Sequence, residues 1–301
     1  MKLTILGCHS ATPRENKHTT SQLLEVGGNL FLIDCGEGTQ VELRRHKIKF
    51  NQIKHVFISH LHGDHYFGLV GLISTFRLLT RETDLHIYGP KGLKELITLQ
   101  MKLADSWTNF KLIFHVLSSK TSELIYEDEK VSVHTIPLDH RIYTNGFLFR
   151  KKTTSHKLIV KKAIDLGIDK TQFSGIKLGK DGVNKKGEII KNIKLVEPLS
   201  PDIVYAFCSD TLFNLRITEQ IRECDLLYHE STFLKKDQNF AVKTFHSTAE
   251  QAAIIAKNSN VKKLILGHFS SRYNNLDLFL NEAKNIFENC ELAIENKSFI
   301  F

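Results

Sequence analysis

The chain has few of the residues that characterise fibrous, disordered or disulfide-stapled proteins. Its 301 residues include only 17 glycines, 5 prolines and 1 tryptophan, while 42% are hydrophobic and 25% are charged. This composition excludes collagen-like and low-complexity chains, and chains that stay disordered for lack of apolar residues. The length is sufficient for a substantial buried core, in one large domain or in two ordinary ones.

Cysteines and long apolar runs are scarce as well. The five cysteines are widely spaced, odd in number and never arranged as CxxC, which argues against a disulfide framework and indicates a reducing cytoplasm. The longest uncharged apolar run, Tyr66–Phe76, is far shorter than the roughly 20 residues of a membrane-spanning helix. The N-terminal residues Met1–Gly7 resemble a first β-strand and not a signal peptide. We therefore expect a cytoplasmic protein without a membrane segment.

The positive charge of the chain is concentrated in one segment. The net charge is +8, and residues 151–197 contain twelve lysines, no arginine and five acidic residues, which leaves +7 in this window and +1 elsewhere. We predict a single domain over residues 1–301 with an inserted basic arm at residues 151–197. Because the arm contains five glycines and a single aromatic residue, Phe173, we expect it to project and to lack a packed core of its own.

On both sides of the arm, short apolar β-like runs alternate with helical patterns, which predicts an α/β fold. We expect strands at residues 3–7, 21–26, 29–34, 55–59, 111–117, 123–126, 131–136, 203–208, 226–228 and 261–266. We expect helices at residues 68–79, 91–103, 214–222 and 276–287, and one that runs to about residue 257 from a capping box at residues 247–250.

The segment SHLHGDH at residues 59–65 is the strongest chemical signal. His60 and His62 are two residues apart, so on an extended segment they point to the same side, and Asp64 and His65 follow directly. Four potential ligands exceed the three protein ligands that one catalytic zinc ion usually takes. The segment therefore predicts two adjacent metal ions, whereas the alternative is a polar loop of structural histidines.

Three more segments place potential ligands directly after apolar β-like runs. His140 follows the predicted strand at 131–136, Asp210 follows the one at 203–208, and His268 follows the one at 261–266. Open α/β sheets form their sites beyond the carboxyl ends of strands, so we expect these residues to join the histidine-rich segment. Asp34 either supports a ligand histidine or is a turn residue, and the sequence leaves both readings open.

These motifs carry a family resemblance. The HLHGDH segment resembles the HxHxDH signature of the metallo-β-lactamase superfamily. Five further segments are similar to motifs of the ribonuclease Z family, the tRNA 3′-processing endonucleases: DCGEGTQ at residues 34–40, SDT at 209–211, HEST at 229–232, HST at 246–248 and HFSSRY at 268–273. The matches follow the family's order along the chain up to about residue 273.

The resemblance implies an αββα sandwich and a zinc-dependent endoribonuclease that removes the 3′ trailer from precursor tRNA. The expected products are a 3′-hydroxyl on the tRNA and a 5′-phosphate on the trailer. The family pattern assigns one zinc ion to His60, His62 and His140, and a second to Asp64, His65 and His268, with Asp210 shared by both. It also makes Asp64 the proton acceptor for the attacking water, equates residues 151–197 with a tRNA-binding arm, and implies a homodimer.

In such a reaction the leaving 3′ oxygen of the tRNA needs a proton. His246 is the candidate donor, and Glu230 would orient it; the alternative is that both are structural. The helix expected after His246 disfavours positive charge at its N-terminal end, so a protonated His246 requires a carboxylate partner.

Two rival functions remain at this point. One is another hydrolase of the superfamily that acts on a small molecule, such as a phosphodiesterase, and the other is a non-catalytic RNA-binding protein. The basic arm argues against the first, because a small substrate would give it no role. The complete set of potential ligands argues against the second.

Overall fold

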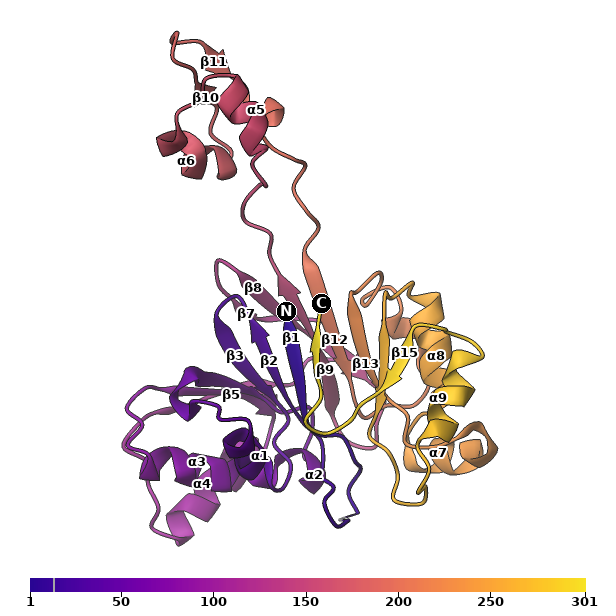
Figure 1. The fold of residues 1–301 in the computed structure, drawn as a ribbon. Coiled ribbons are helices and arrows are strands. Elements are labelled where there is room, and N and C mark those ends of the chain that lie inside the picture. The colour runs from indigo at the N-terminus through magenta and orange to yellow at the C-terminus, as the bar shows by residue number, and fades with distance from the viewer. Residues whose placement is uncertain (13) are drawn as a thin grey trace.

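Two seven-stranded sheets packed face to face form the body of the protein, which the computed structural model describes over residues 1–12 and 14–301 (Figure 1). From edge to edge, the first sheet contains β16 (Ser298–Ile300), β1 (Lys2–Gly7), β2 (Ser21–Val26), β3 (Asn29–Ile33), β4 (Ile53–Phe57), β5 (Leu85–Pro90) and β6 (Leu112–Leu117). The second contains β15 (Cys290–Leu292), β14 (Leu264–Gly267), β13 (Leu226–Glu230), β12 (Ile203–Cys208), β9 (Thr144–Lys151), β8 (Val131–Leu138) and β7 (Leu124–Glu127).

Helices cover the outer face of each sheet, which completes the expected αββα sandwich (Figure 1). The first sheet is covered by α1 (Thr39–Arg45), α3 (Gly68–Leu78) and α4 (Leu93–Leu103), and the second by α7 (Gln238–Thr244), α8 (Ala249–Asn258) and α9 (Asp277–Lys284). A short helix, α2 (Gly63–Tyr66), lies at the lower end of the sandwich. Throughout the described part of the chain, no helix combines the length and apolar character needed to cross a membrane.

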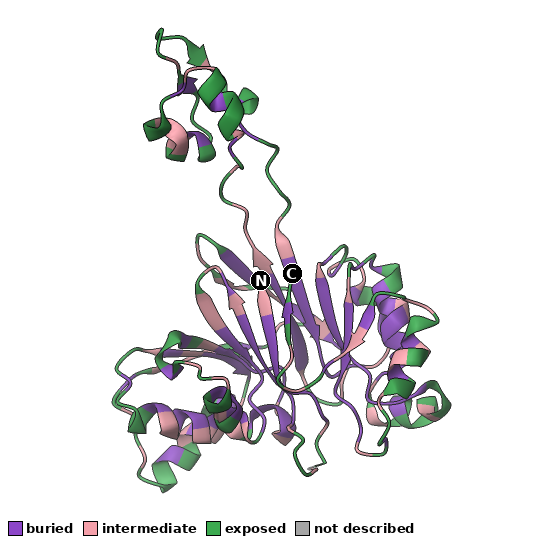
Figure 2. Cartoon of the chain, in the orientation of Figure 1, coloured by how far each residue is buried: buried purple, intermediate pink, exposed green. Residues whose placement is uncertain are grey.

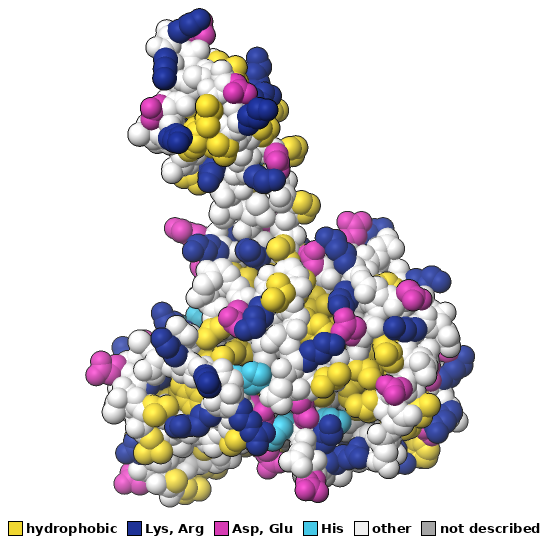
Figure 3. All heavy atoms as spheres, in the orientation of Figure 1, with side chains coloured by type: hydrophobic (Ala, Val, Ile, Leu, Met, Phe, Trp, Pro, Cys, Tyr) yellow, Lys and Arg dark blue, Asp and Glu magenta, His cyan; other side chains and the backbone are white. Residues whose placement is uncertain are grey.

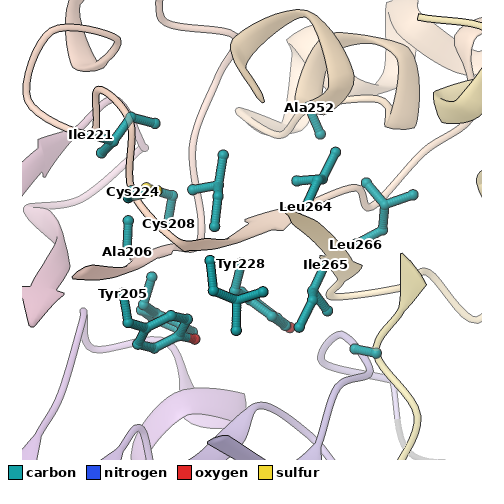
Figure 4. Packing of buried hydrophobic residues seen from close by; sticks show 14 of the residues in the cluster. Tyr205, Ala206, Cys208, Ile221, Cys224, Tyr228, Ala252, Leu264, Ile265 and Leu266 are labelled. Carbon is teal, nitrogen blue, oxygen red and sulfur yellow. The ribbon is translucent and has the colours of Figure 1, made fainter. Parts of the chain in front are cut away.

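Side chains between the two sheets form the main core, and the strands are buried along most of their length (Figure 2). Phe57 of the first sheet packs edge-on against Phe149 of the second, with ring centroids 5.3 Å apart. Figure 4 shows how the second sheet is buried on both faces, with Tyr205 on the side of the first sheet and Leu264 on the side of Ala252 in α8. This double burial fixes the strand ends from which the functional loops extend.

Most predicted strands are confirmed to within three residues, but two local predictions are wrong. Residues 214–222 do not form a helix; the side chain of Asn214 accepts a hydrogen bond from the Arg216 amide and caps a single 3₁₀ turn, Leu215–Ile217. The capping box of α8 lies one residue further along than predicted. Thr248 is the N-cap, and its partner is Gln251.

The segment between β9 and β12 leaves the body on two extended connections and folds into a small separate unit (Figure 1). This arm contains α5 (Val160–Asp165), α6 (Phe173–Lys177) and a hairpin of β10 (Gly182–Val183) and β11 (Ile189–Ile190). The expectation that it lacks a core is wrong. A buried cluster of aliphatic residues lies inside it, with Phe173 packed against them: Leu158, Ala163, Ile168, Ile176, Leu195 and Val196. Because aliphatic residues build this core, the scarcity of aromatic residues did not indicate that a core is absent.

Candidate metal centre

Loops that follow four strands meet at the lower end of the sandwich. They leave the carboxyl ends of β4, β8, β12 and β14, and they bring together every potential ligand predicted from the sequence: His60, His62, Asp64, His65, His140, Asp210 and His268. In one group, His60, His62, His140 and Asp210 each offer a ligand atom within 4.8 Å of the others. Asp64, His65 and His268 form a second group by the same measure.

The first group is tightly gathered around His62. The Nδ1 atom of His62 lies 3.0 Å from His60 Nε2 and 3.1 Å from His140 Nε2. His60 Nε2 in turn lies 3.7 Å from Asp210 Oδ2. Nitrogen ligands of a tetrahedral zinc ion are about 3.3 Å apart, given bonds of about 2.05 Å. The spacing of these atoms therefore fits one such ion.

The second group shares Asp210 with the first. His268 Nε2 lies 3.3 Å from Asp64 Oδ2 and 3.3 Å from Asp210 Oδ1. His65 Nε2 lies 3.4 Å from Asp64 Oδ2 and 3.6 Å from Asp210 Oδ2. The carboxylate of Asp210 thus lies between the two groups, with one oxygen toward His60 and His65 and the other toward His268.

Asp34 supports the second group, which decides between its two sequence readings. Its Oδ2 lies 2.6 Å from His65 Nδ1, and its carboxylate also accepts hydrogen bonds from the amide and hydroxyl of Ser59. A carboxylate partner fixes a proton on Nδ1 of His65, so Nε2 is the nitrogen that is left to bind a metal ion. That Nε2 atom is buried and has no hydrogen-bond partner among the residues described, as expected for an atom that faces a metal ion.

The two carboxylates of the cluster are held in their charged form. Burial opposes the ionisation of Asp64 and Asp210, but the histidines around them keep the pKa of each carboxyl group below its usual range. Imidazole nitrogens and ionised carboxylates are ligands that zinc and similar divalent cations accept. The residues present therefore fit a pair of such ions.

Glu230 and His246 form a second polar unit beside the cluster. His246 Nδ1 lies 2.9 Å from Glu230 Oε1, and the His246 ring centroid is 5.3 Å from that of His268. Burial would lower the pKa of His246, but the charge and hydrogen bond of Glu230 raise it to about 9. Glu230 is therefore the carboxylate partner that a protonated His246 requires beside the N-terminal end of α8.

Two groups of the site were not identified from the sequence. The hydroxyl of Thr232 lies 2.8 Å from His268 Nδ1, and the carbonyl of Phe245 lies 2.8 Å from His140 Nδ1. The HEST motif indicated the segment of Thr232 but not the role of its hydroxyl. A backbone carbonyl such as that of Phe245 leaves no trace in a sequence, because every residue has one.

A cavity of about 820 Å³ opens beside the cluster. His140 and Phe245 line it on the side of the metal centre, and Arg141, Tyr143 and Arg216 contribute charged and aromatic side chains. The space is therefore large enough for a nucleotide-sized group next to the candidate ligands.

Comparison with known proteins gives both partial and full-length relatives. A family model described as Anti-Pycsar protein Apyc1 matches residues 1–198, a range that ends before Asp210, Glu230, His246 and His268. The Ribonuclease Z of Bacteroides thetaiotaomicron is 48% identical over 295 residues, which cover 98% of this chain and 93% of the relative. The Ribonuclease Z of Cytophaga hutchinsonii is 44% identical over 299 residues, 99% of this chain and 95% of the relative.

Solved structures also resemble this chain over nearly its full length. The short form of human tRNase Z superimposes with a TM-score of 0.72 at 26% identity and covers 100% of this chain and 99% of its own. The metallo-β-lactamase fold protein YhfI from Bacillus subtilis superimposes with a TM-score of 0.69 at 18% identity and covers 99% of this chain and 98% of its own. The αββα sandwich described above is thus the metallo-β-lactamase fold.

Proposed function

The chain belongs to the ribonuclease Z family, and through residues 1–198 also to the family of Anti-Pycsar protein Apyc1; from this membership we infer that it is a metal-dependent tRNA 3′-processing endoribonuclease. The observation that carries this function is the double His/Asp cluster in a chain that spans nearly the full length of its ribonuclease Z relatives. The substrate is precursor tRNA, from which the enzyme removes the 3′ trailer.

We propose that the cluster holds two zinc ions. His60, His62 and His140 would bind one, Asp64, His65 and His268 the other, and Asp210 would bind both. The distances between their ligand atoms, the unpartnered Nε2 of His65 and the ionised carboxylates support this assignment. Such a pair of ions would activate water and neutralise the charge that develops on the phosphate during in-line displacement.

Three residues of the chain would handle protons in this reaction. Asp64 is proposed to accept the proton of the attacking water, since its carboxylate is ionised and faces the cluster between His65 and His268. His246 is proposed to donate a proton to the leaving 3′ oxygen of the tRNA. Glu230 would position His246 and stabilise its charge through the contact at 2.9 Å.

The arm is proposed to bind tRNA for the active site of a second subunit. It leaves the body at the end of β9 and returns at the start of β12, whereas His140 and Asp210 lie beyond the opposite ends of these two strands. A six-residue strand is about 20 Å long, so arm and cluster lie at opposite ends of one subunit (Figure 1). A homodimer would let one subunit's arm present tRNA to the partner's cluster.

The five buried, free cysteines support a reducing compartment, and we propose that the enzyme works in the cytoplasm.

Cleavage assays with and without chelator test the function. We expect purified enzyme to cut a precursor tRNA at one site, to leave a 3′-hydroxyl on the tRNA and a 5′-phosphate on the trailer, and to stop when metal is removed. A 2′,3′-cyclic phosphate on the product would contradict the mechanism. Hydrolysis of a chromogenic phosphodiester without tRNA cleavage would favour a small-molecule phosphodiesterase, which the match over residues 1–198 keeps as the second candidate. Tight tRNA binding without hydrolysis of either substrate would indicate a binding protein.

Mixing two inactive variants tests the exchange of arms. One variant lacks the arm and keeps the cluster, and the other keeps the arm and carries His246→Ala. If arms act across a dimer, mixed dimers restore cleavage of precursor tRNA, because one intact arm then serves one intact cluster. If mixing restores nothing although mixed dimers form, each arm serves its own subunit.

A further inference from the structure

A further group of potential metal ligands lies outside the cluster described above. Cys8, His9 and Glu295 each offer a ligand atom, and these atoms lie within 4.8 Å of one another. Cys8 and His9 directly follow β1, and Glu295 lies in the connection from β15 to β16. A thiolate, an imidazole and a carboxylate are all established zinc ligands, and three of them leave one position open for water. Nothing in the proposed tRNA chemistry uses these residues.

His9 is the unusual member of this group. It is 4% exposed, and its Nδ1 is buried without a hydrogen-bond partner among the residues described. A buried nitrogen of this kind lowers the stability of a fold unless a ligand meets it. Burial, followed by the charges of Lys17 and Arg14, lowers the pKa of His9 to about 4. The imidazole is therefore neutral near pH 7, which is the form that binds metal ions.

A cation would replace the Cys8 thiol proton and the contact of Glu295 with Lys17, whereas the other carboxylate oxygen, Oε1, accepts a hydrogen bond from the His18 amide and stays occupied. The Cys8 thiol, a weak donor, makes a 3.4 Å hydrogen bond to the carbonyl of Ala293. Glu295 Oε2 faces the ammonium of Lys17 at 3.7 Å, and the Lys17 side chain is 42% exposed. A long, half-exposed lysine can turn into solvent when a divalent cation takes its place, and metal binding replaces the thiol proton.

We propose that Cys8, His9 and Glu295 bind a divalent cation of the zinc class, separate from the catalytic pair. The site would brace the backbone of His268. The Phe269 amide donates to the Cys8 carbonyl at 3.2 Å, and the Ser10 amide donates to the Phe269 carbonyl at 3.1 Å. His268 itself has a φ of 59°, a left-handed conformation that a non-glycine residue adopts only when its surroundings hold it.

Cobalt substitution tests this site without reference to activity. Metal-free enzyme is loaded with Co²⁺, and the near-ultraviolet thiolate-to-cobalt absorption band is recorded together with the metal content. The catalytic cluster offers only imidazole and carboxylate ligands, so it cannot produce this band. We expect the band in the unsubstituted chain, together with one metal equivalent beyond those of the catalytic cluster.

Variants identify the ligand. Cys8→Ser should abolish the band and the additional equivalent, whereas Cys290→Ser should keep both, because Cys290 is buried but belongs to no such ligand group in the described chain. Glu295→Gln should weaken binding of the additional cobalt at least tenfold, and Lys17→Gln should strengthen it. If Cys8→Ser does not fold, Glu295→Gln and Lys17→Gln decide the outcome by the opposite directions of their effects.

Three results would overturn the proposal: no band in the unsubstituted chain, a band that persists in Cys8→Ser, or equal affinity in Glu295→Gln and Lys17→Gln. The test is independent of the proposed function. A chain that shows the band but does not cleave tRNA would refute the function and keep the metal site. A chain that cleaves tRNA without the band would do the reverse.

Discussion

Removal of the arm should separate tRNA binding from phosphodiester chemistry. The arm is inserted between two strands that are already paired, since Lys151 of β9 lies opposite Ile203 of β12 in the antiparallel register. Directly opposed residues in such a pair have Cα atoms about 5 Å apart, so a short Gly/Ser turn can replace residues 155–200 without pulling the strands apart. Every residue of the metal cluster lies outside this range, and metal content should not change.

The size of the effect follows from the charges removed. Ten lysines lie in residues 155–200, and two of them, Lys157 and Lys191, are in ion pairs. Lysine side chains are spread over the face of the arm seen in Figure 3 rather than gathered in one patch. We take one RNA surface to meet about half of the unpaired ones, or about four phosphates. Each contact adds somewhat under one unit to the log–log salt slope, so the slope should fall by about 3 to 4. Between 50 and 200 mM salt, the tRNA affinity of the unsubstituted chain should therefore fall about 10²-fold more than that of the arm-deleted chain.

The assay measures precursor tRNA binding across a salt series, together with hydrolysis of a chromogenic phosphodiester. The small substrate should be cleaved at an unchanged rate. A matched control keeps the arm and replaces four of its eight unpaired lysines, Lys161, Lys162, Lys185 and Lys186, with glutamine, which should reproduce about half of the slope change without removing the arm's own core. Unchanged tRNA affinity in the arm-deleted chain would show that the lysines are only a solvated surface. Loss of metal or of folding would show that the arm belongs to the body.

Three point variants test the cluster. Asp210→Ala should lose more than one metal equivalent by elemental analysis, because its carboxylate lies between both groups; loss of a single equivalent with retained activity would refute its bridging position. His246→Ala should reduce kcat on tRNA by about 10²- to 10⁴-fold, the usual contribution of a general acid, and keep both metal equivalents; metal loss would make His246 a ligand or a structural residue. Glu230→Gln should reduce kcat and also weaken metal binding in a chelator competition, because the Thr232 hydroxyl connects Glu230 Oε2 to Nδ1 of the candidate ligand His268; intact metal affinity in that variant would contradict this hydrogen-bond path.

The residues of the cluster were predictable because histidines or aspartates follow directly after apolar β-like runs. His140, Asp210 and His268 were each weak candidates alone, and their common position at strand ends joined them to the HLHGDH segment. The residues that hold the candidate ligands in place were harder to predict from the sequence. Asp34 could equally have been a turn residue, and only the packing of β3 beside β4 brings its carboxylate to His65.

The prediction of local structure was wrong where a side chain competes with the periodic pattern. The pattern over residues 214–222 is helical, but Asn214 caps only a single 3₁₀ turn, Leu215–Ile217, and no α-helix continues from it. In the arm, aliphatic residues spaced over forty positions form one core. Such contacts between distant residues do not appear in any short window of sequence.

Glu230 links His246, the proposed proton donor, to the metal cluster. The carboxylate is fully buried, where an unpaired charge would be strongly destabilising. Its Oε1 lies 2.9 Å from His246 Nδ1, and its Oε2 accepts a hydrogen bond from the Thr232 hydroxyl at 2.5 Å. Because the Thr232 hydroxyl donates to Glu230, its oxygen must accept from His268 Nδ1, and the lone pair of His268 is left on Nε2, which faces Asp64 and Asp210.

A glutamine with its amide nitrogen in the place of Oε2 would donate to the Thr232 hydroxyl instead of accepting from it, and would leave the Thr232 and Ser247 amides without their acceptor. The hydroxyl would then donate to His268 Nδ1, and the ring proton would move to Nε2, where it blocks metal binding. One carboxylate therefore sets both the charge of the proposed acid and the tautomer of a proposed ligand. His246→Ala leaves Glu230, and with it the tautomer of His268, unchanged. His246→Ala and Glu230→Gln should therefore differ in metal affinity even where they lose the same amount of turnover.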